Sequence, residues 1–449
     1  MNPVLIIIYR FVLILCLVGA AGYAEARTTA SRVLFVNVNI FDGTSEKLLK
    51  NRNVLVERNL IKKILDRTIS APGAVVIRGQ QRTLMPGLID AHWHTMLNFW
   101  PISRVLAADF GYLSIAAANA SWATLRRGFT TVRDAGGNCL GVKNAIDAGL
   151  VEGPRIYPSG PYIGQTAGHG DFRGPNDVPE NPATPLDYPQ RVGHTLIADG
   201  VPEVLQRSRE ALRMGASQIK TMGGGGVSSL YDPLDVTEYT FDEMKAAVDV
   251  AKTWNTYVMV HVNTDAAVRQ WIQAGAISME HGFFISEATA KLMARKGVWW
   301  SMQPMELSGE DAFVFENPVS QDKYRQVVAG LDHVIALTKK YRVKTAFGTD
   351  LLFDADLAAK QGKFLAKLQK WYTPHEALKM ATHDNAELLK LSGPRDPYPG
   401  QLGVIKEGAL ADLILVDGNP LANLDLVADA DQNFVVIMKD GAIYKNTLP

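Results

Sequence analysis

The stretch Leu84-Met85-Pro86-Gly87-Leu88-Ile89-Asp90-Ala91-His92-Trp93-His94 is an apolar run that ends in two histidines separated by one residue. In a β-strand, alternate side chains point to the same face, so His92 and His94 would project together while Trp93 points the other way. Two imidazoles at this spacing can bind one metal ion. The alternative is a chance His-x-His at the end of a surface strand, and later residues decide between the two.

The middle of the chain alternates apolar stretches with stretches of helical periodicity. Candidate helices include residues 203–214, 241–252 and 288–296, and Thr240 or Thr237 could cap the second of them. The candidate strands are residues 84–92, 130–134, 155–159, 218–222, 258–262, 277–281, 298–302 and 343–350. Strands that alternate with helices in this way predict an α/β fold, a (β/α)8 TIM barrel.

Both ends of the chain read as short β-strands with turns, and the middle does not. The economical arrangement is one small β-sandwich domain built from both ends and flanking the barrel. We therefore expect residues 27–85 and 400–449 to form the two parts of this domain, and residues 86–399 to form the barrel. The Pro- and Gly-rich segment 169–200 is expected to be one long irregular loop.

The first residues have the pattern of a secretory signal. Residues 4–21 are almost wholly apolar, broken by Arg10, and are followed by Ala24-Glu25-Ala26, which resembles a signal peptidase site. We expect residues 1–26 to be removed, which gives a secreted, periplasmic protein that begins near Arg27 and keeps no stable membrane contact. An uncleaved membrane anchor is the alternative, because the apolar run approaches spanning length.

The composition excludes several kinds of partner and of metal site. Lys plus Arg equals Asp plus Glu, at 46 each, so no broad electrostatic attraction to nucleic acid or an anionic membrane follows. Removal of the signal would leave Cys139 as the only cysteine, which rules out an intrachain disulfide and a cysteine-based zinc cluster. The length suits one large barrel plus an accessory module.

Further side chains able to bind a metal lie at one end of the expected strands. They are Lys220, His261, His281 and Asp350, and together with His92 and His94 they fall at the carboxyl ends of their strands. In a TIM barrel these ends form the active-site face. Histidines with only a packing role in the core would not all be expected at the same end of their strands.

Lys220 is the informative member of this set. An ammonium between apolar neighbours in a barrel is costly unless it is paired or neutralised. A neutral amine can react with carbon dioxide to give a carbamate, an anionic ligand with two oxygens that could bridge two metal ions. A buried salt bridge is the alternative interpretation.

Motifs that span nearly the whole mature chain resemble those of a known family. They are Phe41-Asp42-Gly43, Pro86–His94, Gly168-His169-Gly170-Asp171, Glu280-His281-Gly282, Gly348-Thr349-Asp350, Thr373-Pro374-His375-Glu376-Ala377-Leu378 and Gly408-Ala409-Leu410-Ala411-Asp412-Leu413. The chain resembles the metal-dependent amidohydrolase superfamily, in its two-metal branch with a carboxylated lysine. Within it, the chain looks like the imidazolonepropionase-like group, which includes Xaa-Pro dipeptidases, carboxypeptidases acting on C-terminal Arg or Lys, and ochratoxin-type amidases. Such motifs are specific for the superfamily and its metal site, and weak for the substrate.

The resemblance implies a role for each residue. His92 and His94 would bind the more buried metal with Asp350, His261 and His281 would bind the outer metal, and a carbamate on Lys220 would bridge the two. Zinc is the expected metal, because the ligands are rich in nitrogen. Two cations about 3.5–4 Å apart can share a water and lower its pKa toward about 7, and the hydroxide then attacks a carbonyl. Asp350 would carry the proton to the leaving amine.

Secondary candidates lie on the loops above the expected barrel. His169 could hold a substrate carbonyl or carboxylate, or could only pack its loop. Tyr231 follows the glycines at 223–226 and could donate a hydrogen bond to a substrate carbonyl oxygen, or could have only a structural role. Arg173 is a weaker candidate for a substrate carboxylate. Trp299 and Trp300 are expected in the core and pocket wall, His375 and His383 in structural roles, and His333 at the surface.

The sequence therefore predicts a binuclear amidohydrolase that cleaves an amide next to a free C-terminal carboxylate, as in a dipeptide or an N-acyl amino acid. The alternative is a hydrolase of cyclic amides or lactones. True imidazolonepropionases resemble the chain less, because they use one metal and would not need Lys220. A non-catalytic binding protein on a degenerate barrel would have lost a ligand or Asp350, and the sequence shows no such loss. The oligomeric state stays open, a homo-oligomer included.

Overall fold

The computed structural model describes residues 31–67, 70–174, 176–177 and 184–449. The expected signal peptide, residues 1–26, lies outside the described residues. Within the described part of the chain, no helix is both long enough and apolar enough to cross a lipid bilayer. Cys139 is buried with a free thiol.

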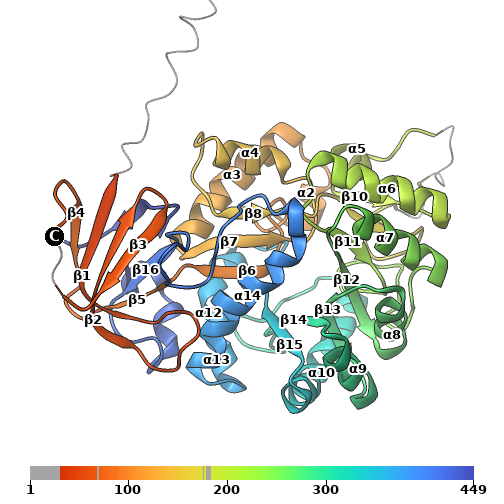
Figure 1. Cartoon of the computed structure of the whole chain (residues 1–449). Coiled ribbons are helices and arrows are strands. Elements are labelled where there is room, and N and C mark those ends of the chain that lie inside the picture. Colours follow the sequence, from red (N-terminus) through yellow and green to blue (C-terminus); the bar gives the residue numbers. More distant parts are fainter. Residues whose placement is uncertain (1–30, 68–69, 175, 178–183) are drawn as a thin grey trace, which may run out of the picture.

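The two chain ends form one eight-stranded sheet (Figure 1). Its order is β18 (Ala442–Asn446), β17 (Phe434–Lys439), β16 (Leu413–Val416), β5 (Thr83–Pro86), β1 (Arg32–Ile40), β2 (Leu49–Glu57) and β3 (Leu60–Leu65), with β4 (Val75–Arg78) paired to β1. The ends meet where β5 and β16 pair antiparallel, with Leu413 opposite Pro86. The expected joining of both ends is thus seen as one sheet, whereas a sandwich of two sheets stays a prediction.

The middle of the chain is an α/β structure with parallel strands, as predicted. One parallel sheet contains β6 (Leu88–Trp93), β7 (Phe129–Asp134) and β8 (Arg155–Tyr157). The other has the order β10 (Thr195–Ile197), β9 (Tyr162–Gly164), β11 (Ile219–Met222), β12 (Val258–Thr264), β13 (Ser278–Phe284), β14 (Trp299–Met302) and β15 (Lys344–Phe347).

Hydrogen bonds connect the two parallel sheets at two places. Asn385 Nδ2 donates at 2.8 Å to Ile89 O on β6 and at 2.8 Å to Phe347 O on β15. At the second place, Gln218, which directly precedes β11, donates through Nε2 to Tyr157 O on β8 at 3.0 Å. Gly348 permits the close approach of the first and last strands, because a Cβ there would lie 2.5 Å from His92 Cβ. These contacts are compatible with a closed barrel, although the strand pairing itself does not record closure.

The segment 169–200 differs from the single irregular loop that was expected. It contains α5 (Tyr188–Val192) and β10, and β10 pairs with β9, a strand absent from the predicted set. The helix has a local cause. Asp187 caps it by accepting a hydrogen bond from Gln190 N, and Pro189 occupies its first turn.

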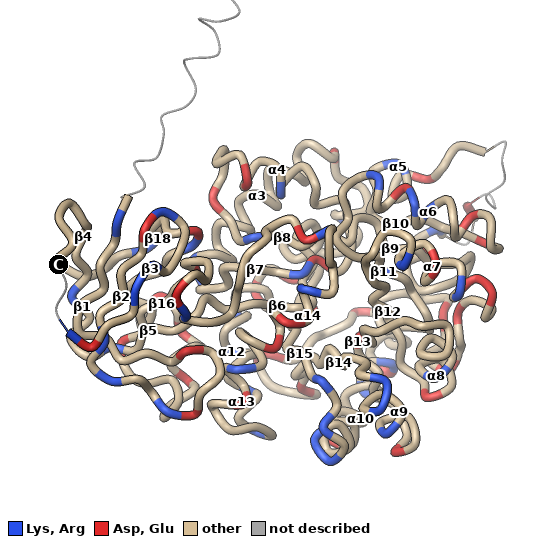
Figure 2. The backbone as a smooth tube through the Cα atoms, in the orientation of Figure 1, with Lys and Arg blue, Asp and Glu red and all other residues tan. Residues whose placement is uncertain are grey.

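Helices alternate with the strands along the middle of the chain, including at the places predicted from the sequence. Thr240 and Glu243 form a capping box at the start of α7 (Phe241–Thr253), which confirms one of the two expected caps. The other α-helices of the described residues are α2 (Ile102–Val105), α3 (Phe110–Arg126), α4 (Leu140–Asp147), α6 (Gly200–Met214), α8 (Asp265–Ala274), α9 (Glu287–Lys296), α10 (Pro318–Tyr341), α11 (Ala355–Ala359), α12 (Gln361–Ala366), α13 (Pro374–Lys379), α14 (Asn385–Leu389) and α15 (Ala430–Asn433). Figure 2 shows charges of both signs along the chain-end sheet and the middle part alike.

A buried ion pair joins the middle part to the chain-end sheet. Arg155 of β8 donates through Nε to Asp412 Oδ2 at 2.9 Å and through Nη2 to Asp440 Oδ1 at 2.7 Å. Burial alone would lower the pKa of Arg155, but the two carboxylates outweigh it and raise that pKa above its ordinary value. The guanidinium therefore stays charged between the two parts of the fold.

We predict that Arg155→Met lowers the free energy of unfolding by about 3–5 kcal/mol, because it leaves the buried Asp412 carboxylate without its partner. Equilibrium unfolding in denaturant measures the change. Arg325→Met is the matched control, since Arg325 pairs with Asp322 at the surface and should leave stability nearly unchanged. An Arg155→Met protein as stable as the wild type would contradict the assignment.

Candidate metal centre

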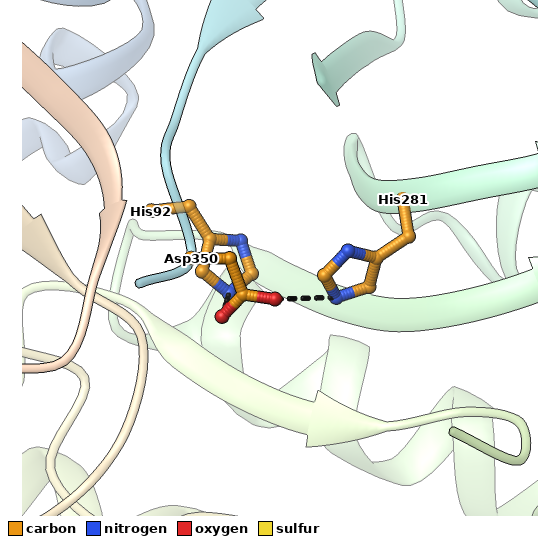
Figure 3. Close-up of side chains that lie close together, drawn as sticks. All are labelled: His92, His281 and Asp350. Atoms are coloured by element: carbon orange, nitrogen blue, oxygen red, sulfur yellow. Dashed lines mark ion pairs between the residues drawn. The ribbon is translucent and has the colours of Figure 1, made fainter. Parts of the chain in front are cut away.

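Three of the predicted metal ligands come together at the carboxyl ends of the parallel strands. Ring nitrogens of His92 and His281 and a carboxylate oxygen of Asp350 all lie within 4.8 Å of one another. Figure 3 shows the Asp350 carboxylate pointing toward both rings, with Oδ1 3.4 Å from His92 Nε2 and Oδ2 3.9 Å from His281 Nε2. Donor atoms around a tetrahedral zinc ion, at about 2.0–2.1 Å from it, lie roughly 3.4 Å apart. The spacing therefore suits a shared cation.

The other predicted ligands lie beside this triad. His94 Nε2 is 3.1 Å from the same Asp350 Oδ1, and the His261 ring centroid is 4.6 Å from that of His281. Lys220, on β11, lines the same cavity and is almost fully buried. The structure thus gathers all six residues, and places three of them within reach of a single ion.

Burial sets the protonation states that metal binding requires. It lowers the pKa of His92 to about 4 and that of His281 to about 3, so both rings are neutral at pH 7. It also lowers the pKa of Lys220 to about 8. Burial would raise the pKa of Asp350, but the neighbouring histidines hold it below its ordinary value. Neutral imidazoles and an ionised carboxylate are the metal-binding forms of these groups, so the donor set fits a divalent cation.

A buried carboxylate orients His92 from behind. His92 Nδ1 lies 2.8 Å from Glu280 Oε2, which leaves Nε2 directed toward Asp350. Arg133 in turn donates through Nη2 to both oxygens of Glu280, at 2.9 and 2.8 Å. His281 Nδ1 similarly lies 2.8 Å from Gln303 Oε1. Support of this kind fixes the ring orientation of metal-binding histidines.

Asp90 ties His92 to the segment that carries Asp350. Its Oδ1 accepts hydrogen bonds from His92 N and Thr349 N, each at 3.0 Å, and its Oδ2 accepts from Thr349 Oγ1 at 2.6 Å. Two residues of the site also hold left-handed backbone conformations, with φ of 76° at His281 and 53° at Asp350. Non-glycine residues adopt that region rarely and at a cost, which the surrounding hydrogen bonds must offset.

A cavity of about 780 Å³ opens above these residues. Its lining includes all of the residues predicted to bind metal or substrate, namely His92, His94, His169, Arg173, Lys220, Tyr231, His261, His281 and Asp350. Tyr231 is half-exposed there. Arg173 lies at the wall but is already paired with Asp171, through contacts of 2.8 and 2.6 Å.

The two tryptophans of β14 do not form the expected pocket wall. Trp299 packs in a core cluster with Ala91 and Met259, and Trp300 is fully buried with Nε1 donating to His281 O at 2.5 Å. Successive side chains of a strand point to opposite faces, so the two tryptophans pack in different core clusters, and neither is among the residues that line the cavity. Aromatic side chains from other segments line it instead, namely Tyr162, Phe172, Phe283, Phe313, Phe315 and Tyr324. His375 and His383 lie outside the lining, and His333 is exposed, as expected.

Several supporting residues were not singled out from the sequence. Glu280 and Asp90 lie inside the motifs quoted from the sequence. Glu280 directly precedes His281, and Asp90 lies two residues before His92, so both could have been recognised from their positions beside predicted ligands. Arg133 lies in a segment with no such pattern, so only the folded chain reveals its role.

Comparison with known proteins places the chain in a family. Residues 83–445 match the model of the Amidohydrolase family, so the chain belongs to that family and is a hydrolase acting on amide or peptide bonds. Ochratoxinase of Aspergillus niger is 30% identical over 414 residues, which cover 86% of this chain and 83% of the relative.

Solved structures show the same similarity. A prolidase complexed with N-methylphosphonate-L-proline is 33% identical with a TM-score of 0.84, over 93% of this chain and 100% of the other. A Xaa-Pro dipeptidase with methionine bound in its active site is 26% identical with a TM-score of 0.78, over 93% and 100%. The family is typically metal-dependent, in agreement with the donor set described above.

We predict that Glu280→Gln weakens the binding of a divalent metal about 10- to 100-fold, because the amide cannot serve both His92 and the Arg133 guanidinium. Titration of the metal-free protein with zinc, followed by elemental analysis, measures the loss. The surface variant Glu287→Gln on α9 should bind as the wild type does. Unchanged affinity in Glu280→Gln would show that Glu280 does not support a metal ligand.

Proposed function

We propose that this protein is a binuclear metal-dependent amidohydrolase that releases an amino acid with a free α-carboxylate from a dipeptide or an N-acyl amino acid. The observation that carries the proposal is the convergence of His92, His281 and Asp350 beside Lys220 in one buried cavity. The similarity to a prolidase and to a Xaa-Pro dipeptidase favours a dipeptide-like substrate.

Six residues would hold the metals. His92, His94 and Asp350 would bind one divalent ion, His261 and His281 the other, and a carbamate on Lys220 would bridge both. Zinc suits this nitrogen-rich set. When bound, the cations would activate water and polarise the substrate carbonyl.

The protein's own residues would then move the proton and orient the substrate. Asp350 would accept a proton on a carboxylate oxygen and pass it to the leaving nitrogen. His169 would bind the substrate through Nε2, since its Nδ1 already lies 2.9 Å from Asp232 Oδ2 and 2.5 Å from Ser229 Oγ. Tyr231 would donate its hydroxyl hydrogen to a substrate oxygen.

One observation favours a second function. The pairing of Arg173 with Asp171 occupies the one arginine in the cavity lining that was expected to anchor a carboxylate. A substrate without a carboxylate, such as a cyclic amide or a lactone, would not need that anchor.

The wider organisation belongs to the same proposal. Eight of the ten parallel strands, β6–β8 and β11–β15, would close into the predicted barrel over residues 86–399, and residues 27–85 and 400–449 would form a β-sandwich. Residues 1–26 would direct the enzyme to the periplasm and would then be removed.

We predict that amidating the C-terminus of a dipeptide substrate lowers kcat/KM roughly 10- to 100-fold, since a charge-assisted hydrogen bond of about 1.5–3 kcal/mol is lost. Matched free-acid and amidated libraries, read by mass spectrometry, provide the measurement. Equal rates on both would refute the carboxylate requirement and would make the cyclic substrates the leading class.

We predict that Lys220→Ala abolishes most activity and that short carboxylic acids restore part of it, because an added carboxylate can replace the carbamate. The wild-type enzyme assayed in the same acids is the control. Activity of the variant close to that of the wild type would show that Lys220 is only a structural lysine.

A further inference from the structure

The segment of residues 223–235, between β11 and α7, turns tightly at the wall of the cavity. It brings Ser229 and Tyr231 into the lining. A Cβ at Gly225 would lie 1.9 Å from Pro233 O, and a Cβ at Gly226 would lie 2.2 Å from His169 Cε1. Because these approaches exclude a side chain, the turn closes on itself and the His169 ring lies directly against it.

A buried lysine from α10 occupies the centre of this turn. Lys323 Nζ donates to three main-chain carbonyls, Gly226 O at 3.0 Å, Ser229 O at 2.9 Å and Asp232 O at 2.7 Å. An ammonium has three N–H donors and no acceptor, so these carbonyls use every donor it has. The side chain is 8% exposed, and Nζ also lies 3.4 Å from Asp232 Oδ1. The turn thus encloses a cation that a distant helix supplies.

Asp232 connects this cation to His169. Its Oδ2 accepts a hydrogen bond from Gly226 N at 2.7 Å and lies 2.9 Å from His169 Nδ1. Burial alone would raise the pKa of Asp232, but hydrogen bonds from His169, Ser229 and Gly226 lower it to about 2, so the carboxylate is ionised. The His169 ring stacks on that of His261, with centroids 4.1 Å apart and planes 15° apart. An unbroken series of contacts therefore runs from α10 to the cavity floor.

We propose that Lys323 is a positioning residue for amide hydrolysis, which holds the turn of residues 226–232 so that Tyr231 reaches the cavity and His169 presents Nε2 to the substrate. The inference rests on the proposed function for the roles of His169 and Tyr231. Contacts to three carbonyls of one turn distinguish Lys323 from a lysine that merely packs its helix, because they fix the path of the segment. None of these contacts is made directly to a residue proposed to bind metal.

The first test is chemical rescue. Lys323→Ala should lower kcat/KM on the order of 10- to 100-fold with metal content unchanged. n-Propylamine replaces the three carbons and the ammonium that the substitution removes, so it should restore part of the activity. n-Propanol, which has a similar shape but no charge, should not. The wild-type enzyme in each additive is the control, and an Ala variant with wild-type kinetics would overturn the proposal.

The second test does not depend on the substrate. Lys323→Met keeps most of the buried volume, so it covers the case in which the Ala variant does not fold. Hydrogen–deuterium exchange of the amides of residues 226–232 should be about tenfold faster in Lys323→Met, with β12 and β13 unchanged. Lys340→Met is the control on the same helix, since Lys340 is exposed and pairs with Glu287.

The two tests separate this inference from the proposed function. Unchanged exchange in Lys323→Met would overturn the role of Lys323 whatever the enzyme hydrolyses. Faster exchange with wild-type kinetics would overturn its contribution to catalysis. If the wild-type enzyme cleaved no dipeptide or N-acyl amino acid, the proposed function would fail, and the exchange result would still decide whether Lys323 holds the turn.

Discussion

The structure depends on one part-buried carboxylate, that of Asp350, which lies against the imidazoles of His92, His94 and His281. A carboxylate largely removed from water loses several kcal/mol of solvation, and the contacts with the histidines offset part of that loss. Burial keeps the rings of His92 and His281 neutral at pH 7, so a full compensating charge must come from elsewhere. A divalent cation between the oxygens and the nitrogens would supply it, and amide hydrolysis is chemistry that such a cation supports.

One arrangement occurs twice around the cavity. A buried carboxylate orients an imidazole, and a cationic side chain in turn holds that carboxylate. Glu280 orients His92 and is held by Arg133. Asp232 orients His169 and is held by Lys323. Each carboxylate would be costly alone, and each is stable because donors occupy both of its oxygens. Rings held this firmly lose little freedom when metal or substrate binds, which is what preorganisation requires.

Sequence patterns predicted the α/β architecture and the gathering of the site residues. Side chains alternate between the two faces of a strand, so the sequence already shows which residues share a face. His92 and His94 project together from β6 for that reason, while Trp93 packs in the core. Lys220 drew attention by chemistry, as a charged residue among apolar neighbours. Burial of that residue in the cavity agrees with this interpretation.

Other features depend on contacts between distant segments, so periodicity could not predict them. Arg133 and Glu280 are separated by 147 positions, and Lys323 and Asp232 by 91. The outward orientation of Trp300 followed from a strand register that an apolar run leaves open. The short strands β9 and β10 carry few residues each, too few for a periodic signal.

The central claim is that this cavity holds two metal ions bridged by a modified lysine. A crystal structure of protein purified without chelators, with diffraction recorded on both sides of the zinc absorption edge, tests it most directly. We expect two anomalous peaks, one beside His92 and His94 and one beside His261 and His281, with density for a carboxyl group on Lys220 Nζ. A single peak, or none, with an unmodified Lys220 side chain would contradict it.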